Sequence, residues 1–178
     1  VTALSDFFRT TLSKGRDYIT VQEEESHIRS YLKIQQFRYQ DILDYEIDIP
    51  EEMYHYQILK LTLQPLVENA LTHGLKNARG EKRVTVRAHK WEENLRIVVE
   101  DNGVGIRPQR MEELLQPHTE QETSIGLSNI DSRMKMLYGE AYGVTIESEE
   151  GKGTRVYLVI PRRKMDEVEL WKAENTRC

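Results

Sequence analysis

The segments LQPLVENALTHG at 63–74, VEDNGVGI at 99–106 and SIGLSNI at 124–130 decide how this chain folds. The first places apolar residues at helical spacing and ends at a glycine, which suits a helix stop. The second is a strand of β-branched residues that ends in Asp101 and a glycine-rich turn. The third leads from Gly126 straight into a helix. In this order they predict an α+β protein with a nucleotide site between the elements.

The elements around these segments follow from hydrophobic periodicity, turn residues and caps. Thr20 is expected to cap a helix together with Glu23, three residues later. Pro65 is expected to kink a helix at 55–73 or to begin a new one. Clustered strands with segregated helices predict an α+β two-layer sandwich. The predicted elements are a helix at 1–12, a helix from Thr20 to about 38, a strand at 44–50, a helix at 55–73 stopped by Gly74, a hairpin of 84–90 and 95–100, a connection at 107–123 with a short helix at 109–115, a helix at 128–139 stopped by Gly139 and a hairpin of 144–149 and 154–160.

Length and composition limit the classes of protein that this chain can be. With 178 residues it can hold one main domain and some additional helix. Its net charge of −5 argues against a nucleic-acid partner, and its single cysteine, Cys178, excludes a disulfide framework. No apolar run is long enough to span a bilayer. Because the chain begins at Val1 inside a helical pattern, we expect a fragment of a longer protein.

Asn69 and His73 lie one helical turn apart and therefore project from the same helix face. An Asn amide oxygen is a neutral ligand that suits Mg²⁺ held mainly by phosphates and waters. Glu68 precedes it and could orient a metal-bound water. Taken singly, Asn69 is more often a satisfied buried amide, and His73 is more often a structural cation near a helix end.

Asp101 ends a strand and opens the turn DNGVG. A carboxylate at a strand end can accept a hydrogen bond from the exocyclic amino group of adenine, where guanine carries an oxo group. Gly103 and Gly105 let the backbone approach a ligand closely. Alone, the Asn-Gly pair favours a simple hairpin turn, but the second glycine and the segment at 124–130 favour a ligand site.

Free N–H groups at the helix start in 124–130 can bind phosphate. Ser124 could add a hydroxyl donor, although ordinary capping by Ser124 or Ser128 is the common alternative. The chain has no standard phosphate loop, dinucleotide fingerprint, zinc cluster or serine hydrolase motif. The remaining candidates are cations for phosphate and a hydroxyl for the adenine end: Lys76, Arg79, Arg133 and Thr154.

Together these segments resemble the GHKL superfamily of gyrase, Hsp90, histidine kinase and MutL ATPases. LQPLVENALTHG is similar to its N box, VEDNGVGI to its G1 box, SIGLSNI to its G2 box, and GKGT at 151–154 to a further glycine box. Within that group, residues 128–161 resemble the end of sensor histidine kinases of the YesM/LytS type. Residues 21–41 resemble the segment that joins the phosphoacceptor hairpin to the ATP-binding domain, and 4–12 resemble the second hairpin helix.

This resemblance implies a Bergerat-type ATP-binding fold with ATP and Mg²⁺ as its cofactors. Asn69 would be the Mg²⁺ ligand, Asp101 would read adenine, and residues 107–123 would form the ATP lid. The domains would be a partial hairpin helix and linker at 1–20, a catalytic domain at 21–161 and a tail at 162–178. The other implied site residues are Glu68 and His73 for catalysis, Gly103, Gly105, Ile106 and Thr154 around the purine, and Lys76, Ser124, Ile125, Gly126, Leu127 and Arg133 for the phosphates.

The chain departs from the family pattern at two positions. Position 124 is Ser where the G2 box usually begins with Gly, so the lid and phosphate loop are expected to be stiffer. Position 65 is Pro, where gyrase-like relatives hold the glutamate that activates water. Its absence fits a kinase, which must keep water from competing for the γ-phosphoryl group.

The family's phosphoacceptor histidine lies in a P-H-F-type motif that this chain lacks. His27, His55, His89 and His118 do not have that context, so the acceptor is expected upstream of Val1. The resemblance thus implies a fragment that binds ATP but does not phosphorylate itself, from a protein that transfers phosphate through the histidine to a response regulator. The whole protein would be a homodimer with an upstream membrane-spanning sensor, and this part would be cytoplasmic.

Two alternatives to a histidine kinase remain. A non-catalytic module that signals its ATP or ADP state would be favoured by loss of Asn69 or Asp101, and both are present. A gyrase-like ATPase is disfavoured by Pro65. Phosphotransfer to an added hairpin would distinguish a kinase from the non-catalytic module. ATP hydrolysis that depends on Glu68 would favour the gyrase-like ATPase.

Overall fold

The computed structural model describes residues 18–39, 42–108, 110–111 and 125–164. The helix predicted at 1–12, the residue Ser124, most of the predicted lid and the tail from 165 lie outside these residues. The helices and strands run, in chain order, β1 Tyr18–Thr20, α2 Val21–Arg38, β2 Leu43–Asp48, η1 Glu51–Met53, β3 Gln57–Leu59, α3 Leu63–Asn69, η2 Ala70–Leu75, β4 Lys82–Trp91, β5 Asn94–Asp101, α5 Ile125–Tyr138, β6 Gly143–Glu149 and β7 Gly153–Pro161.

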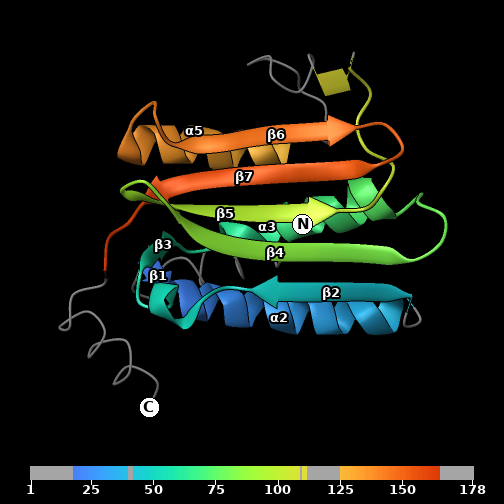
Figure 1. The fold of residues 1–178 in the computed structure, drawn as a ribbon, viewed down its shortest axis with the longest axis horizontal. Helices are drawn as coiled ribbons and strands as arrows, with labels where there is room; N and C mark the ends of the chain where they lie inside the picture. The colour runs from blue at the N-terminus through green and yellow to red at the C-terminus, as the bar shows by residue number, and fades with distance from the viewer. Residues whose placement is uncertain (1–17, 40–41, 109, 112–124, 165–178) are drawn as a thin grey trace, which may run out of the picture.

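A five-stranded sheet forms one layer and the helices form the other (Figure 1). The strand order is β2-β4-β5-β7-β6, with β2 parallel to β4 and every other neighbour antiparallel. The predicted α+β two-layer sandwich is therefore confirmed. Alternate strand residues point at the helices, and the layers close over a core that includes Ile28, Leu32, Leu66, Val84, Ile97, Met134 and Leu158.

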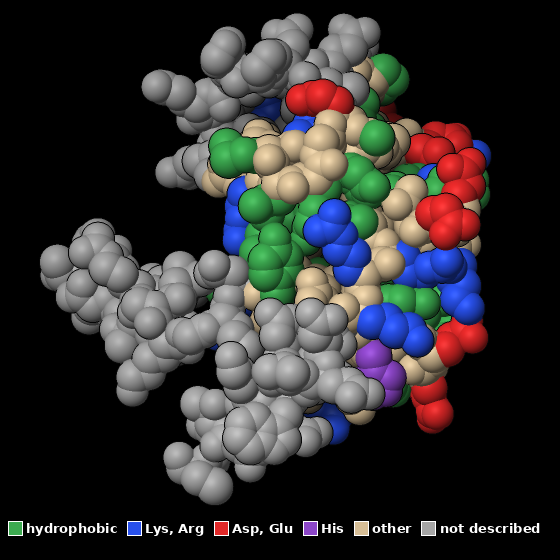
Figure 2. Space-filling model, turned by 90° about the vertical axis from the view of Figure 1, so that its left-hand side faces the viewer, with side chains coloured by type: hydrophobic (Ala, Val, Ile, Leu, Met, Phe, Trp, Pro, Cys, Tyr) green, Lys and Arg blue, Asp and Glu red, His purple; other side chains and the backbone are tan. Residues whose placement is uncertain are grey.

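The outer face of the sheet carries charged side chains, which allows it to face water. Glu100 on β5 pairs with Arg155 on β7 at 2.7 Å and with Arg87 on β4 at 3.7 Å. In Figure 2 acidic and basic side chains gather along the right-hand edge, which is this face seen from its side. This face is therefore the solvated side of the sheet, and the apolar core lies on its helical side.

The predicted cap of α2 is confirmed. The Thr20 backbone N–H donates to the Glu23 carboxylate at 2.9 Å, and the Glu23 N–H donates to the Thr20 hydroxyl at 3.1 Å. This reciprocal pair satisfies two N–H groups that a helix start otherwise leaves open. The helix then buries Ile28 and Leu32 completely. In the described part of the chain, no helix is long and apolar enough to cross a membrane.

The helix predicted at 55–73 is wrong in its first half, and of the two roles predicted for Pro65, a position at the start of a new helix is the one observed. Residues Gln57–Leu59 form β3, which pairs antiparallel with β1, and the helix begins only at Leu63. Ile58 and Leu59 are both buried although they are adjacent in a strand, so β3 lacks the alternation of buried and exposed residues that indicates a strand. Leu59 also lies four residues before Leu63, which matches helical spacing. Pro65 occupies the third position of α3, where no intrahelical N–H bond is required.

Gly74 is not the helix stop that the sequence predicts. The helix continues as a π-helical segment, η2, through Leu75. By contrast Gly139 does end α5, and its N–H donates to the Lys135 carbonyl at 2.8 Å. The two predicted hairpins, β4–β5 and β6–β7, are also confirmed.

Candidate nucleotide-binding site

A cavity of about 300 Å³ lies between α3 with η2, the end of β5, the beginning of β7 and the start of α5. Its walls are largely apolar, with a few polar groups that face one another across it. Such a lining suits a flat ring that is fixed at a small number of points. The apolar lining comes from Leu66, Ala70, Val99, Ile106, Leu127 and Val156, and the polar lining from Asn69, His73, Asp101, Arg107, Arg110 and Thr154.

Asp101 is the last residue of β5 and one of the few buried charged side chains in the described residues. Its Oδ1 accepts the Gly103 N–H at 2.8 Å, and the carboxylate faces the cavity, where its remaining lone pairs can accept from a ligand. Burial raises the pKa of the Asp101 carboxyl to about 6, against the opposing effect of the backbone N–H groups of Gly103 and Thr154. Thr154 lies directly across from it in the β5–β7 register.

The turn after Asp101 is held in place by close backbone approaches. A Cβ at Gly103 would overlap the carbonyl oxygen of Gly74, which accepts the Val104 N–H at 3.0 Å. Gly105 has φ +66°, and a Cβ there would overlap the Glu149 carbonyl. These glycines therefore let the turn pack between the end of η2 and the β6–β7 turn.

Asn69 ends α3 on the opposite wall of the cavity. Its Nδ2 is buried and has no hydrogen-bond partner within the described protein. A Cβ built at Gly126, in the first turn of α5, would lie 3.3 Å from that atom. The N box and the G2 box are thus side by side, as the sequence predicts, and a buried unsatisfied amide there calls for a polar group from a ligand.

His73 also lines the cavity, one turn beyond Asn69. Burial lowers its pKa, and the charges of Lys76 and Arg110 lower it further. Burial and these neighbouring cations therefore favour the neutral imidazole over the charged one. Lys76 itself does not line the cavity.

Three other predicted residues stand away from the cavity or are only partly described. Glu68 accepts a hydrogen bond from Gln64 Nε2 at 2.8 Å and does not line the cavity. Arg133 is exposed on α5, also outside the lining. Ile125 opens α5, next to the undescribed Ser124.

Sequence reasoning missed most of the apolar wall and two cations. Leu66 lies three residues before Asn69, and Ala70 lies four residues after Leu66 and three before His73, so helical spacing joins them along one wall. Val99 lies two residues before Asp101 on β5, on the same side of the strand. Helical and strand periodicity could have found these wall residues once the helix and strand were known, whereas nothing in the pattern distinguishes Arg107 and Arg110.

The geometry is that of a small-molecule pocket with apolar walls and a few facing polar groups, and comparison with known proteins gives the family. Residues 56–164 match the family model described as histidine kinase-, DNA gyrase B- and HSP90-like ATPase. The chain belongs to this family. Residues 1–43 separately match the model described as histidine kinase.

Named relatives point to one branch of the family. The chain is 37% identical to the sensor histidine kinase YesM of Bacillus subtilis (strain 168) over 163 residues, 92% of this chain and 27% of YesM. It is also 33% identical to the sensor histidine kinase BtsS of Escherichia coli (strain K12) over 160 residues, 90% of this chain and 27% of BtsS. The resemblance to the YesM/LytS type is thus confirmed, and the chain spans just over a quarter of the length of these relatives.

Solved structures confirm the fold. The catalytic domain of histidine kinase ThkA superposes with a TM-score of 0.62 at 14% identity, covering 83% of this chain and 97% of that one. The Bergerat-type sandwich implied by the resemblance is therefore correct.

Proposed function

We propose that this chain is the ATP-binding catalytic domain of a two-component sensor histidine kinase. It would transfer the γ-phosphoryl group of ATP to a histidine located upstream of this fragment. The observation that supports this best is the pairing of a buried carboxylate, Asp101, with an unsatisfied amide, Asn69, on opposite walls of one apolar cavity. These two groups suit the two ends of a nucleotide.

The adenine end is proposed to lie against β5 and β7. The ring would stack between the apolar walls, and the carboxylate of Asp101 would accept its exocyclic amino hydrogen. Thr154 lines the cavity, and its hydroxyl is held by Ser148 at 2.9 Å, which in turn donates to the Gly153 carbonyl at 2.9 Å. Guanine would place an oxo group against the carboxylate and be rejected.

The phosphate end is proposed to lie between Asn69 and the start of α5. Asn69 would give its amide oxygen to Mg²⁺, and phosphate oxygens and waters would complete the coordination. When bound, the ion neutralises charge on the phosphoryl oxygens. Gly126 allows close approach of phosphate to the N–H groups of the helix start. Arg107 and Arg110 line the cavity and would add positive charge near the phosphates.

In phosphoryl transfer these residues would position the nucleotide and keep water away from the γ-phosphoryl group. Position 65 is Pro, and Glu68 is engaged by Gln64 outside the cavity lining. Neither is therefore placed as a general base for hydrolysis, which supports phosphotransfer over an ATPase cycle. Neutral His73 would act as a hydrogen-bonding group near the phosphates.

The partners of the whole protein are part of the proposal. The structure of histidine kinase ThkA in complex with response regulator protein TrrA, with a TM-score of 0.57 at 16% identity over 91% of this chain and 48% of that one, supports a response regulator as the phosphate recipient. We also propose a homodimer, a membrane-spanning sensor upstream, and the division into 1–20, 21–161 and 162–178.

Calorimetric titration with Mg²⁺–ATP and Mg²⁺–GTP tests the proposal. ATP should bind and GTP should not, and ATP with a labelled γ-phosphate should label an added hairpin that carries a phosphoacceptor histidine. Asn69→Ala should abolish labelling while adenosine still binds. Equal binding of both nucleotides, or no ATP binding at all, would refute the proposed site.

A further inference from the structure

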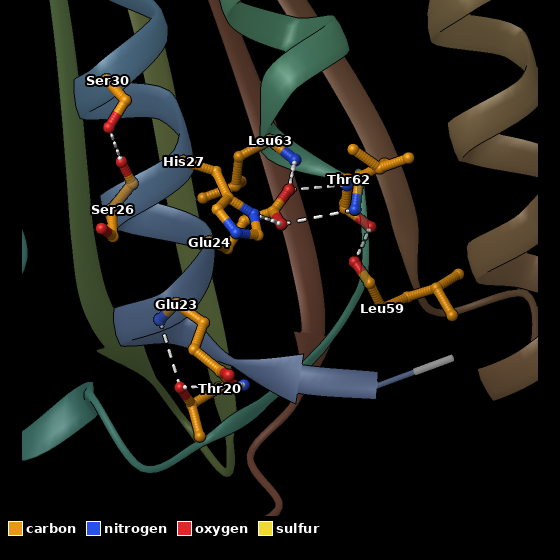
Figure 3. A network of polar contacts seen from close by, with 10 residues as sticks. Thr20, Glu23, Glu24, Ser26, His27, Ser30, Leu59, Thr62 and Leu63 are labelled. Carbon is orange, nitrogen blue, oxygen red and sulfur yellow. Dashed lines mark hydrogen bonds and ion pairs between the residues drawn. The ribbon is translucent and has the colours of Figure 1, made fainter. Parts of the chain in front are cut away.

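A carboxylate outside the cavity lining is completely buried and is not used by the mechanism above. Glu24 lies in the first turn of α2 with no exposed surface. Its Oε1 accepts the N–H groups of Thr62 and Leu63, each at 2.8 Å, and its Oε2 accepts the Leu61 N–H at 3.3 Å. Figure 3 shows the side chain reaching from α2 to the start of α3, with His27 beside it at 3.8 Å.

These N–H groups belong to a helix start that has no cap of its own. Thr62 precedes α3, but its hydroxyl donates back to the Leu59 carbonyl at 2.5 Å. Leu61 has φ +59°, which a branched side chain adopts only under constraint. The Glu24 carboxylate therefore replaces the local cap and holds the strained turn, and its negative charge also suits the positive end of the helix.

The helix that Glu24 holds is the one that carries the nucleotide residues. Leu66 and Asn69, one and two turns into α3, both line the cavity. Glu24 lies in the 1–43 region that matches the histidine kinase model, whereas α3 lies in the 56–164 region that matches the ATPase model. One buried side chain thus links α2 to the wall of the site.

We infer that Glu24 is a positioning residue for the phosphate end of the nucleotide site, acting through the start of α3 on Asn69. This inference rests on the proposed function of the cavity. It has a specific consequence: a change at Glu24 should affect interactions of Asn69 with Mg²⁺ and phosphates, and should leave the adenine contacts on β5 and β7 in place. A merely structural role would weaken both ends alike.

Glu24→Gln is the sharpest variant, because it keeps size and shape. The amide oxygen can still accept from Thr62 and Leu63, but its NH₂ group then faces the Leu61 N–H, and the charge is lost. Glu25→Gln is the matched control on the same helix. Glu25 is also buried, but its ion pair is with Arg29 within α2.

The experiment measures dissociation constants of Mg²⁺–ATP and of adenosine for the 178-residue chain and both variants, well below their melting temperatures. We expect Glu24→Gln to weaken Mg²⁺–ATP about tenfold, as loss of an orienting partner behind a ligand does, and adenosine by less than about twofold. Glu25→Gln should change neither. Unchanged Mg²⁺–ATP affinity in Glu24→Gln, equal loss for both ligands, or an equal loss in Glu25→Gln would overturn the inference.

Two further outcomes remain decisive. If the unmutated chain binds no Mg²⁺–ATP, the proposed function fails, and the inference fails with it. If Glu24→Gln does not fold, hydrogen exchange of the Thr62 and Leu63 amides in the unmutated chain replaces it. Because coupling is reciprocal, Mg²⁺–ATP should slow this exchange several-fold more than adenosine does, and identical rates would contradict the link.

Discussion

Replacing Asp101 by asparagine should stabilise the fold while weakening the nucleotide site. In the native protein burial raises the pKa of the carboxyl from 3.8 to about 6. A shift of roughly two units corresponds to about 3 kcal/mol by which the fold disfavours the ionised form. The substituted amide carries no charge, and its oxygen can still accept the Gly103 N–H, but its NH₂ group cannot accept the Thr154 N–H, so about 3 kcal/mol is the upper limit. At pH 8 the variant should therefore be up to about 3 kcal/mol more stable towards unfolding than the unmutated chain.

The pH dependence gives the sign of the effect. Below about pH 4 the Asp101 carboxyl is largely protonated in both the native and the unfolded chain, so the two proteins should differ little. As pH rises towards and through about 6, the unfolded carboxyl ionises before the native one, and the unmutated chain loses stability that the variant keeps. Urea unfolding at several pH values between 4 and 8 measures this growing difference, with Glu52→Gln, a change of an exposed carboxylate outside the cavity lining, as the control.

Binding should change in the opposite direction. At pH 8 loss of a charge-assisted hydrogen bond to adenine should cost about 1.5–3 kcal/mol, which is tenfold or more in ATP affinity by calorimetry. A side chain that costs stability and gains affinity is typical of a functional site. Stability curves of the two proteins that stay parallel across the pH range would refute the reasoning about burial, and unchanged ATP affinity would refute the adenine contact.

Three other changes test the framework around the site by urea unfolding. Gly103→Ala should lower the free energy of unfolding by about 3 kcal/mol, because its Cβ overlaps the Gly74 carbonyl. Its control, Gly80→Ala, lies in open space with φ +82° and should lower it by about 1 kcal/mol. Equal losses would contradict the close approach at Gly103. Thr20→Ala removes the cap of α2 and should cost about 1 kcal/mol, without changing ATP affinity. Lys82→Met leaves two carbonyls after η2 without their ammonium donor, so a loss of about 1–3 kcal/mol is expected, and a neutral result would show that water replaces it.

Much of the site can be predicted because its residues lie in short segments with their own local signals. Asp101 is indicated by a strand end followed by glycines, and Asn69 by its place in a helical segment. Both line the cavity. Arg133 is a candidate because it shares a helix with the phosphate loop, but position on a helix does not fix its face, and the side chain is exposed. Gly74 is predicted to end a helix, whereas its carbonyl accepts the Val104 N–H from the turn after Asp101.

The sequence prediction fails at the start of α3 for a physical reason. A local pattern can reveal a helix start only when the cap is local, and here Thr62 turns its hydroxyl back to Leu59. The cap instead comes from Glu24, 38 residues earlier than Thr62. With that start hidden, the buried residues of β3 are assigned to the helix. The contact of Glu24 with Thr62, which a local sequence pattern cannot reveal, also joins α2 to the wall of the cavity. By the inference above, the position of Asn69 then depends on a residue 45 positions earlier in the chain.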